Sequence, residues 1–69
     1  MSEETKFFMY LMEHYAAYKH RKTGEILKEW ESHGILQTIY DGYWNYHTEC
    51  LQNAFDDIDS LVTTGKHAW

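Results

Sequence analysis

The stretch Ile35–Val62, ILQTIYDGYWNYHTECLQNAFDDIDSLV, decides the fold of this chain. In its second half, apolar residues recur at the spacing of one helical face and fall within an arc of roughly 120° at about 100° per residue. They are Leu51, Ala54, Phe55, Ile58, Leu61 and Val62. This pattern predicts a helix with Thr48 as its N-cap, running to about Thr63 or Thr64 before Gly65 stops it.

The first half of the same stretch predicts a separate helix, from Ile35 to about Tyr46. Its inward stripe is narrow and consists of Leu36, Tyr40, Tyr43 and His47, flanked by Ile39, Trp44 and Tyr46. Gly42 lies inside this helix, where glycine costs about 1 kcal/mol relative to alanine. We therefore expect another helix to approach the backbone closely at Gly42.

Two more helices are predicted upstream. Ser2 is a suitable N-cap for a helix that continues to about Arg21, and Thr23 can cap a shorter helix that ends at Gly34. The inward stripe of the first helix is Phe7, Phe8, Leu11, Met12, Tyr15 and Tyr18, and that of the second is Ile26, Leu27 and Trp30.

Together these segments predict an all-α fold, a compact bundle of four helices with a short second helix and no sheet. The bundle forms a single domain over residues 1–64. Residues 65–69 are expected to form a loose C-terminal tail, in which Trp69 could fold back on the bundle.

The length of 69 residues limits both the number of domains and the size of the core. A core of this size contributes roughly 3–5 kcal/mol of net stability, so we expect dense aromatic packing or self-association to assist it. Cys50 is the only cysteine, which excludes an internal disulfide and favours a reducing compartment. The acidic N-terminal start does not resemble a secretory signal, so a cytoplasmic location is expected.

The net charge of −5 bears on which partners the chain can bind. Its basic residues are scattered, and a nucleic-acid interface needs a coherent positive face, so nucleic-acid binding is not expected. A basic protein partner is favoured instead. The apolar run from Phe7 to Met12 is far shorter than the roughly 20 residues that span a bilayer, so no membrane segment is expected.

No set of residues predicts catalysis, a cofactor or a metal. His47 and Cys50 share one helical face, but zinc needs three or four ligands and no matching pair accompanies them. Cys50 could be a reactive thiol near a helix start, although an inert small side chain is the commoner role. Phosphate-binding loops and nucleophile motifs are absent, and we expect a protein that is not an enzyme.

Two surfaces are candidates for binding a partner. Met9, Tyr10, Ala16 and Ala17 lie on the far side of the first helix, which either wraps the bundle on two sides or contacts another chain. The second is an acidic run that is either a solvated face or a contact for a basic protein. Separately, Tyr40, Tyr43, Trp44 and Tyr46 cannot all face one core, so one or two rings of the third helix should lie near the surface. The residues taken from these regions are Tyr46, Asp56, Asp57 and Asp59.

A motif with the order Tyr43-x-x-x-His47-Thr48, followed by Asp57-Ile58-Asp59, resembles the bacterial domain-of-unknown-function family DUF3791. With the aromatic first helix, the resemblance extends from about Glu4 to Val62. Tyr43, His47, Thr48, Asp57 and Ile58 are thus a candidate structural motif. The family has no assigned activity. The resemblance implies that members are often encoded beside a family similar to ADP-ribosyltransferases, in an arrangement like a toxin–antitoxin pair.

These observations lead to one hypothesis and one alternative. The chain is expected to be a non-enzymatic protein-interaction module, an antitoxin-like partner of a neighbouring toxin, and also a candidate homodimer through its first helix. The alternative is a small acidic regulator or phage-type inhibitor that mimics nucleic acid and blocks a basic protein site.

Overall fold

The computed structural model describes residues 1–69 and contains helices but no strand. The helices are α1 (Glu3–Tyr18), α2 (Thr23–Ser32), α3 (Leu36–Asp41), α4 (Tyr43–Thr48) and α5 (Leu51–Thr64). The prediction of an all-α fold is confirmed. The helix count differs from the prediction, because the segment expected to be one helix from Ile35 to Tyr46 forms both α3 and α4.

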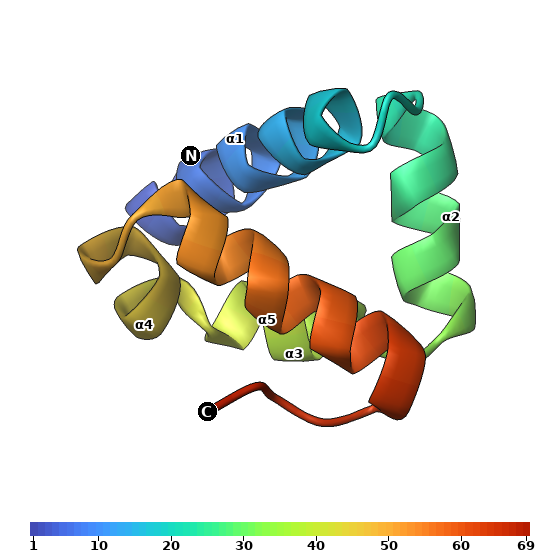
Figure 1. The fold of residues 1–69 in the computed structure, drawn as a ribbon. Coiled ribbons are helices and arrows are strands. Elements are labelled where there is room, and N and C mark those ends of the chain that lie inside the picture. The colour runs from blue at the N-terminus through green and yellow to red at the C-terminus, as the bar shows by residue number, and fades with distance from the viewer.

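The helices pack against one another in a single unit that measures 25 × 24 × 20 Å along its principal axes. α1 contacts α2, α3 and α4, and α4 also contacts α5. In Figure 1, α2 links α1 to α3 at one end of the molecule, and the C-terminal segment turns back along α5. None of the helices is both long enough and apolar enough to cross a bilayer.

The aromatic residues supply the centre of the core. Trp30 on α2 is fully enclosed, with ring centroids 5.7 Å from Phe8 and 5.8 Å from Tyr15 of α1. The predicted stripe of α5 is confirmed: Ala54, Phe55, Ile58 and Leu61 are buried, and Leu51 and Val62 pack against the core. Enclosing such large rings removes about 150–250 Å² each from water, which suits a chain too short for a large aliphatic core.

Most of the predicted inward face of α1 is confirmed, since Leu11, Met12 and Tyr15 are buried and Phe7 and Phe8 pack against the core, but two positions differ. Tyr18 is exposed rather than inward, although its ring still stacks on Phe55 at 4.8 Å. Ala16 is buried at 2% exposure and belongs to the core. A small side chain therefore lies where α1 approaches its neighbours, so Ala16 cannot form part of an external interface.

Gly42 separates α3 from α4, and the ring of Tyr46 lies against its backbone. A Cβ atom at Gly42 would lie 2.5 Å from Cε2 and 2.9 Å from Cδ2 of Tyr46. The close approach expected at Gly42 is present, but it comes from the next helix in the chain. The break also changes which residues face inward: Ile39 and Tyr46 are buried, whereas the predicted stripe of Leu36, Tyr40, Tyr43 and His47 is only partly buried.

The helix ends follow the capping prediction in part. The Ser2 side chain accepts a hydrogen bond from the Thr5 amide, as predicted for an N-cap. Gly65 ends α5 with a left-handed φ of 77°, also as predicted. Thr48, however, is not the N-cap of α5. It ends α4, where its hydroxyl donates to the carbonyls of Trp44 and Asn45, and Cys50 occupies the N-cap position of α5.

The C-terminal segment differs from the loose tail that was expected. His67 Nδ1 donates to Asp57 Oδ2 at 2.8 Å, and the Ala68 amide donates to Asp57 Oδ1 at 2.5 Å. Trp69 lies with its ring centroid 5.6 Å from that of Tyr46. The segment therefore folds back on the bundle, as considered for Trp69, and is held there by hydrogen bonds to a buried carboxylate.

Candidate functional site

A continuous group of rings covers the outer side of α1 and α4, and we call it the aromatic surface. It consists of Phe7, Tyr10, Tyr43, Trp44 and His47. Phe7 is its centre, with ring centroids 6.1 Å from Tyr10, 5.6 Å from Tyr43 and 6.1 Å from His47. Trp44 extends the group from α4, 5.1 Å from His47.

Helical spacing positions these rings. Phe7 and Tyr10 are three residues apart on α1, and Tyr43 and His47 are four apart on α4, so each pair shares a face. The rings of Tyr43 and His47 stack at 4.1 Å with an interplanar angle of 11°. His47 Nδ1 also donates to the Tyr43 carbonyl at 2.5 Å. Because a carbonyl oxygen can only accept, this bond fixes the imidazole with its proton on Nδ1.

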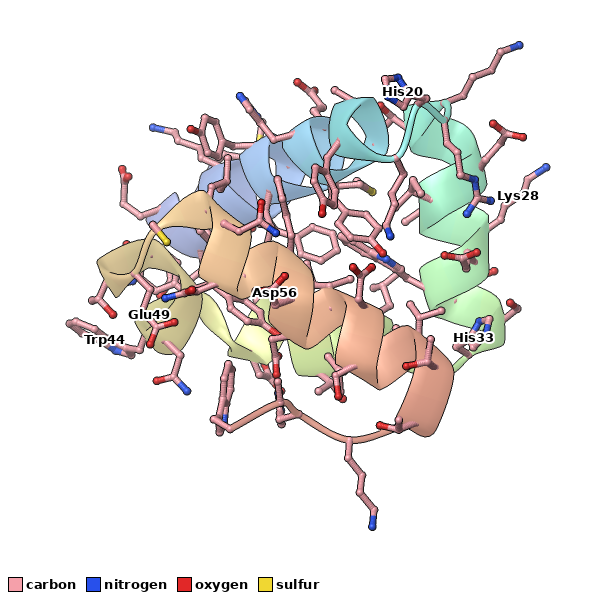
Figure 2. All side chains as sticks on the ribbon, in the orientation of Figure 1. His20, Lys28, His33, Trp44, Glu49 and Asp56 are labelled. Atoms are coloured by element: carbon pink, nitrogen blue, oxygen red, sulfur yellow. The ribbon has the colours of Figure 1, made fainter.

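Two members of the aromatic surface are strongly exposed to solvent. Trp44 is 73% exposed and Tyr10 is 48% exposed. In Figure 2 the Trp44 side chain projects away from α4. The other three rings are partly buried and support these two from below.

An open hollow of about 390 Å³ lies on the aromatic surface. Phe7, Tyr10, Tyr43 and His47 line it, and Glu3 and Lys6 form its polar edge. The Lys6 ammonium lies 3.6 Å from the Glu3 carboxylate, and both side chains are largely exposed. An apolar floor with one charge of each sign at its edge resembles the layout of protein-binding surfaces, which have apolar centres and polar rims.

The structure separates the residues predicted for the interaction surface. Met9, Tyr10 and Ala17 are exposed on α1, but Ala16 is in the core. Tyr46 was also expected near the surface and is 1% exposed. Only Tyr10 of these residues belongs to the aromatic surface.

The three aspartates of α5 have three different environments and do not form a shared acidic face. Asp56 is exposed and accepts a hydrogen bond from Gln52 (Figure 2). Asp59 joins α5 to α1, because its carboxylate accepts from the Tyr15 hydroxyl at 2.5 Å and lies 2.9 Å from the Lys19 ammonium. Burial and the hydrogen bond to Asp59 raise the pKa of Tyr15 well above its usual value.

Asp57 is buried, in contrast to the surface position predicted for it. It is 1% exposed and accepts hydrogen bonds from the Tyr46 hydroxyl, His67 Nδ1 and the Ala68 amide. Burial and the bond to Asp57 raise the pKa of Tyr46 well above its usual value. Three donors around one buried carboxylate replace the water that it gives up, which explains how a charged residue is accommodated here.

The candidate structural motif spans the contact between α4 and α5. Tyr43, His47 and Thr48 lie on α4, and Asp57 and Ile58 lie on α5. The direct bond between the two helices is made by Tyr46, which the motif did not include, through its hydroxyl to Asp57. Ile58 is fully buried beside it on α5.

The residues weighed for metal or thiol chemistry, His47 and Cys50, have different surroundings. Cys50 is exposed at the start of α5, and Nδ1 of His47 is already bonded to a carbonyl. No group of three or more His, Cys, Asp or Glu side chains is arranged to hold a metal ion.

Phe7 was assigned to the inward stripe and does pack against the core, although its ring also lines the hollow of the aromatic surface. Trp44 was placed on the flank of a longer helix and was not singled out as an exposed ring. The break at Gly42 turns α4 so that Tyr46 faces inward and Trp44 outward. The sequence nevertheless indicates an exposed ring in this segment, because Tyr43, Trp44 and Tyr46 cannot all face one core.

The fold and this surface define a class: small all-α domains stabilised by aromatic packing, with an exposed aromatic face. Residues 6–64 match the family described as Protein of unknown function (DUF3791). The chain therefore belongs to the DUF3791 family, as its motifs had indicated. Neither a curated protein nor a solved structure matches the chain.

Proposed function

We propose that this chain is a non-enzymatic protein-interaction module that binds a partner through the aromatic surface. The observation that carries the proposal is the 73% exposure of Trp44 at the edge of a pre-packed group of rings. Single exposed apolar residues are ordinary, but contiguous ones mark binding sites. Tryptophan and tyrosine are also the residues that dominate binding energy at interfaces.

The packing of the rings supports tight binding. Tyr43 and His47 hold one another by stacking, and Phe7 lies against both. Side chains that are already ordered lose little conformational entropy when a partner covers them. The aromatic surface is thus organised for binding before the partner arrives.

The partner that we propose is a protein encoded beside this chain, with this chain acting as its antitoxin-like neutraliser. The net charge of −5 favours a basic partner and would speed its association. The alternative, an acidic mimic of nucleic acid, has less support, because Asp57 is internal and Asp59 is neutralised by Lys19.

The test is co-expression of the chain with the product of the adjacent gene, followed by affinity capture and calorimetry. Tyr10→Ala combined with Trp44→Ala should weaken binding by at least about tenfold, as expected for the two most exposed rings of the aromatic surface. Leu27→Ala is the matched control, since Leu27 is an exposed apolar residue on α2. Equal losses in the control and the double variant would contradict the assignment to the aromatic surface.

A further inference from the structure

We propose that Asp57 and Tyr46 form a binding site for an extended peptide, which residues 67–69 occupy as an internal ligand. The ligand from a partner would be a basic segment that offers a His or Arg side chain, the next backbone N–H and a nearby aromatic ring. This site is separate from the aromatic surface, so the two proposals can fail independently.

The hydrogen bonds of Asp57 divide unequally between the bundle and the tail. Only the Tyr46 hydroxyl comes from the helical bundle. The other two donors, His67 Nδ1 and the Ala68 amide, come from the tail at 2.8 and 2.5 Å. Without the tail, the Asp57 carboxylate would keep one protein donor and would be opened to solvent, so water or another ligand would supply the missing donors. The helices alone therefore form an incomplete site.

The tail binds with side chain, backbone and ring together. Its two hydrogen bonds engage both carboxylate oxygens of Asp57, one through a side chain and one through the main chain. Trp69 packs on Tyr46 and stacks on His67 at 4.3 Å with an interplanar angle of 14°. Peptide-recognition sites use this combination of main-chain hydrogen bonds and side-chain contacts.

The tail can leave without disturbing the core. Trp69 is 57% exposed, and none of residues 65–69 is among the buried core residues. The turn before them is fixed separately, because Gly65 is left-handed and the Ser60 hydroxyl donates to the Lys66 carbonyl at 2.8 Å. Release of residues 67–69 therefore opens the Asp57 site while the end of α5 stays in place.

The chemistry of the site selects a basic segment. An arginine in place of His67 could donate two parallel hydrogen bonds to the carboxylate, a stronger arrangement than a single imidazole N–H. The overall charge of −5 favours the approach of such a segment. Because the tail competes from within the same chain, its effective concentration is high and the partner must bind strongly enough to displace it.

The experiment titrates an acetylated synthetic peptide with the tail sequence TGKHAW into the chain of residues 1–69 and follows backbone amide NMR signals around Asp57. The variant His67→Ala with Trp69→Ala opens the site by removing one donor and the ring. It should bind TGKHAW at least about tenfold more tightly than the unaltered chain, in which the tail competes. The control variant is His33→Ala, which removes an exposed imidazole on the end of α2 and should bind as the unaltered chain does.

A second peptide and a second variant complete the test. TGKAAA, which lacks the imidazole and the indole, should not bind the opened chain. If the double variant fails to fold, Trp69→Ala retains both donors to Asp57 and should still gain about threefold in affinity for TGKHAW over the unaltered chain. Equal binding of TGKHAW to opened and unaltered chains, or equal binding of the two peptides, would overturn the proposal.

Discussion

Asp57 is the single residue on which most of the C-terminal half depends. It lies on the buried side of α5, next to Ala54, Ile58 and Leu61, and is charged where its neighbours are apolar. Three hydrogen bonds tie it to Tyr46 of α4 and to His67 and Ala68 of the tail. A substitution that removes a buried, hydrogen-bonded charge is among the few single changes that destabilise a protein strongly.

We predict that Asp57→Asn lowers the free energy of unfolding by about 2–4 kcal/mol, because the amide group turns an N–H toward donors that need an acceptor. Asp56→Asn is the matched control, since Asp56 is the preceding residue, is exposed and accepts only from Gln52. The control should change stability by less than about 0.5 kcal/mol. Urea denaturation followed by circular dichroism measures both, and equal stability of the two variants would contradict the buried position of Asp57.

The buried tyrosines predict a loss of stability in alkaline solution. The pKa values of Tyr15 and Tyr46 are raised in the folded chain by burial and by bonds to Asp59 and Asp57. An unfolded tyrosine titrates near 10, so above that pH the unfolded state releases protons that the folded state keeps. The stability contributed by these two groups is therefore complete below about pH 10 and is lost as the pH rises further.

Tyr15→Phe should make the fall in stability above about pH 10 shallower, because one of the two linked protons is removed. Thermal unfolding recorded between pH 8 and 11 provides the measurement, because this range extends to both sides of the ordinary tyrosine pKa of about 10. Tyr10→Phe serves as the control, since Tyr10 is half exposed. A control slope that changes as much as the Tyr15 slope would argue against the assignment.

At the scale of helices, the α3–α4 break depends on the contact between Gly42 and Tyr46. The sequence predicted one continuous helix because periodicity and propensity report local preferences, and no local signal marks a ring folded against a backbone four residues earlier. The apolar arc and the caps at Ser2 and Gly65 placed the start of α1 and the end of α5 well, because those features lie within or directly beside each helix. The predicted N-caps Thr23 and Thr48 are wrong, since Lys22 and Cys50 occupy these positions of α2 and α5. Asp57 was wrongly predicted to lie on the surface for a related reason. It lies about 40° from Leu61 on a helical wheel, at the edge of the apolar arc, and at this position burial depends on the C-terminal tail.

We predict that Gly42→Ala destabilises the chain by about 1–3 kcal/mol, although alanine is the better helix former. The added Cβ would lie 2.5 Å from the Tyr46 ring, which is buried and held by Asp57 and therefore cannot move away easily. The comparison is Gly24→Ala in the first turn of α2, where a Cβ meets nothing within 4 Å. That change should be neutral or stabilising, and chemical denaturation distinguishes the two. A stabilised Gly42→Ala would show that the ring yields to the methyl group.

For the molecule as a whole, self-association remains a prediction. The interface expected from the sequence combined Met9, Tyr10, Ala16 and Ala17, but Ala16 is buried within the fold. The aromatic surface is the more extensive apolar region on α1, and it includes Tyr10. A symmetric dimer would cover this surface with the same surface of a second copy, when no other partner is present.

Sedimentation equilibrium at tens of micromolar should then give about twice the chain mass of 8.3 kDa. Trp44→Glu should shift the protein toward monomer without lowering its stability as a monomer, since the side chain is exposed and contributes little to the core. Leu27→Glu on α2 provides the control and should leave the mass unchanged. A monomer of unaltered sequence would restrict the aromatic surface to binding other proteins.

Tyr46 contacts Gly42 through its ring, Asp57 through its hydroxyl and Trp69 through a T-shaped contact between the two rings. The effects of substitutions at these positions should consequently be epistatic. In a Tyr46→Leu background, Gly42→Ala and Trp69→Ala should each lower the free energy of unfolding by less than they do in the unaltered chain. The reason is that the Tyr46 ring, which both substitutions affect, is no longer present. In related sequences, Gly42, Tyr46, Asp57 and Trp69 should therefore be retained or replaced together. A sequence without Tyr46 should tolerate replacement of the glycine, of the aspartate and of the tail residues.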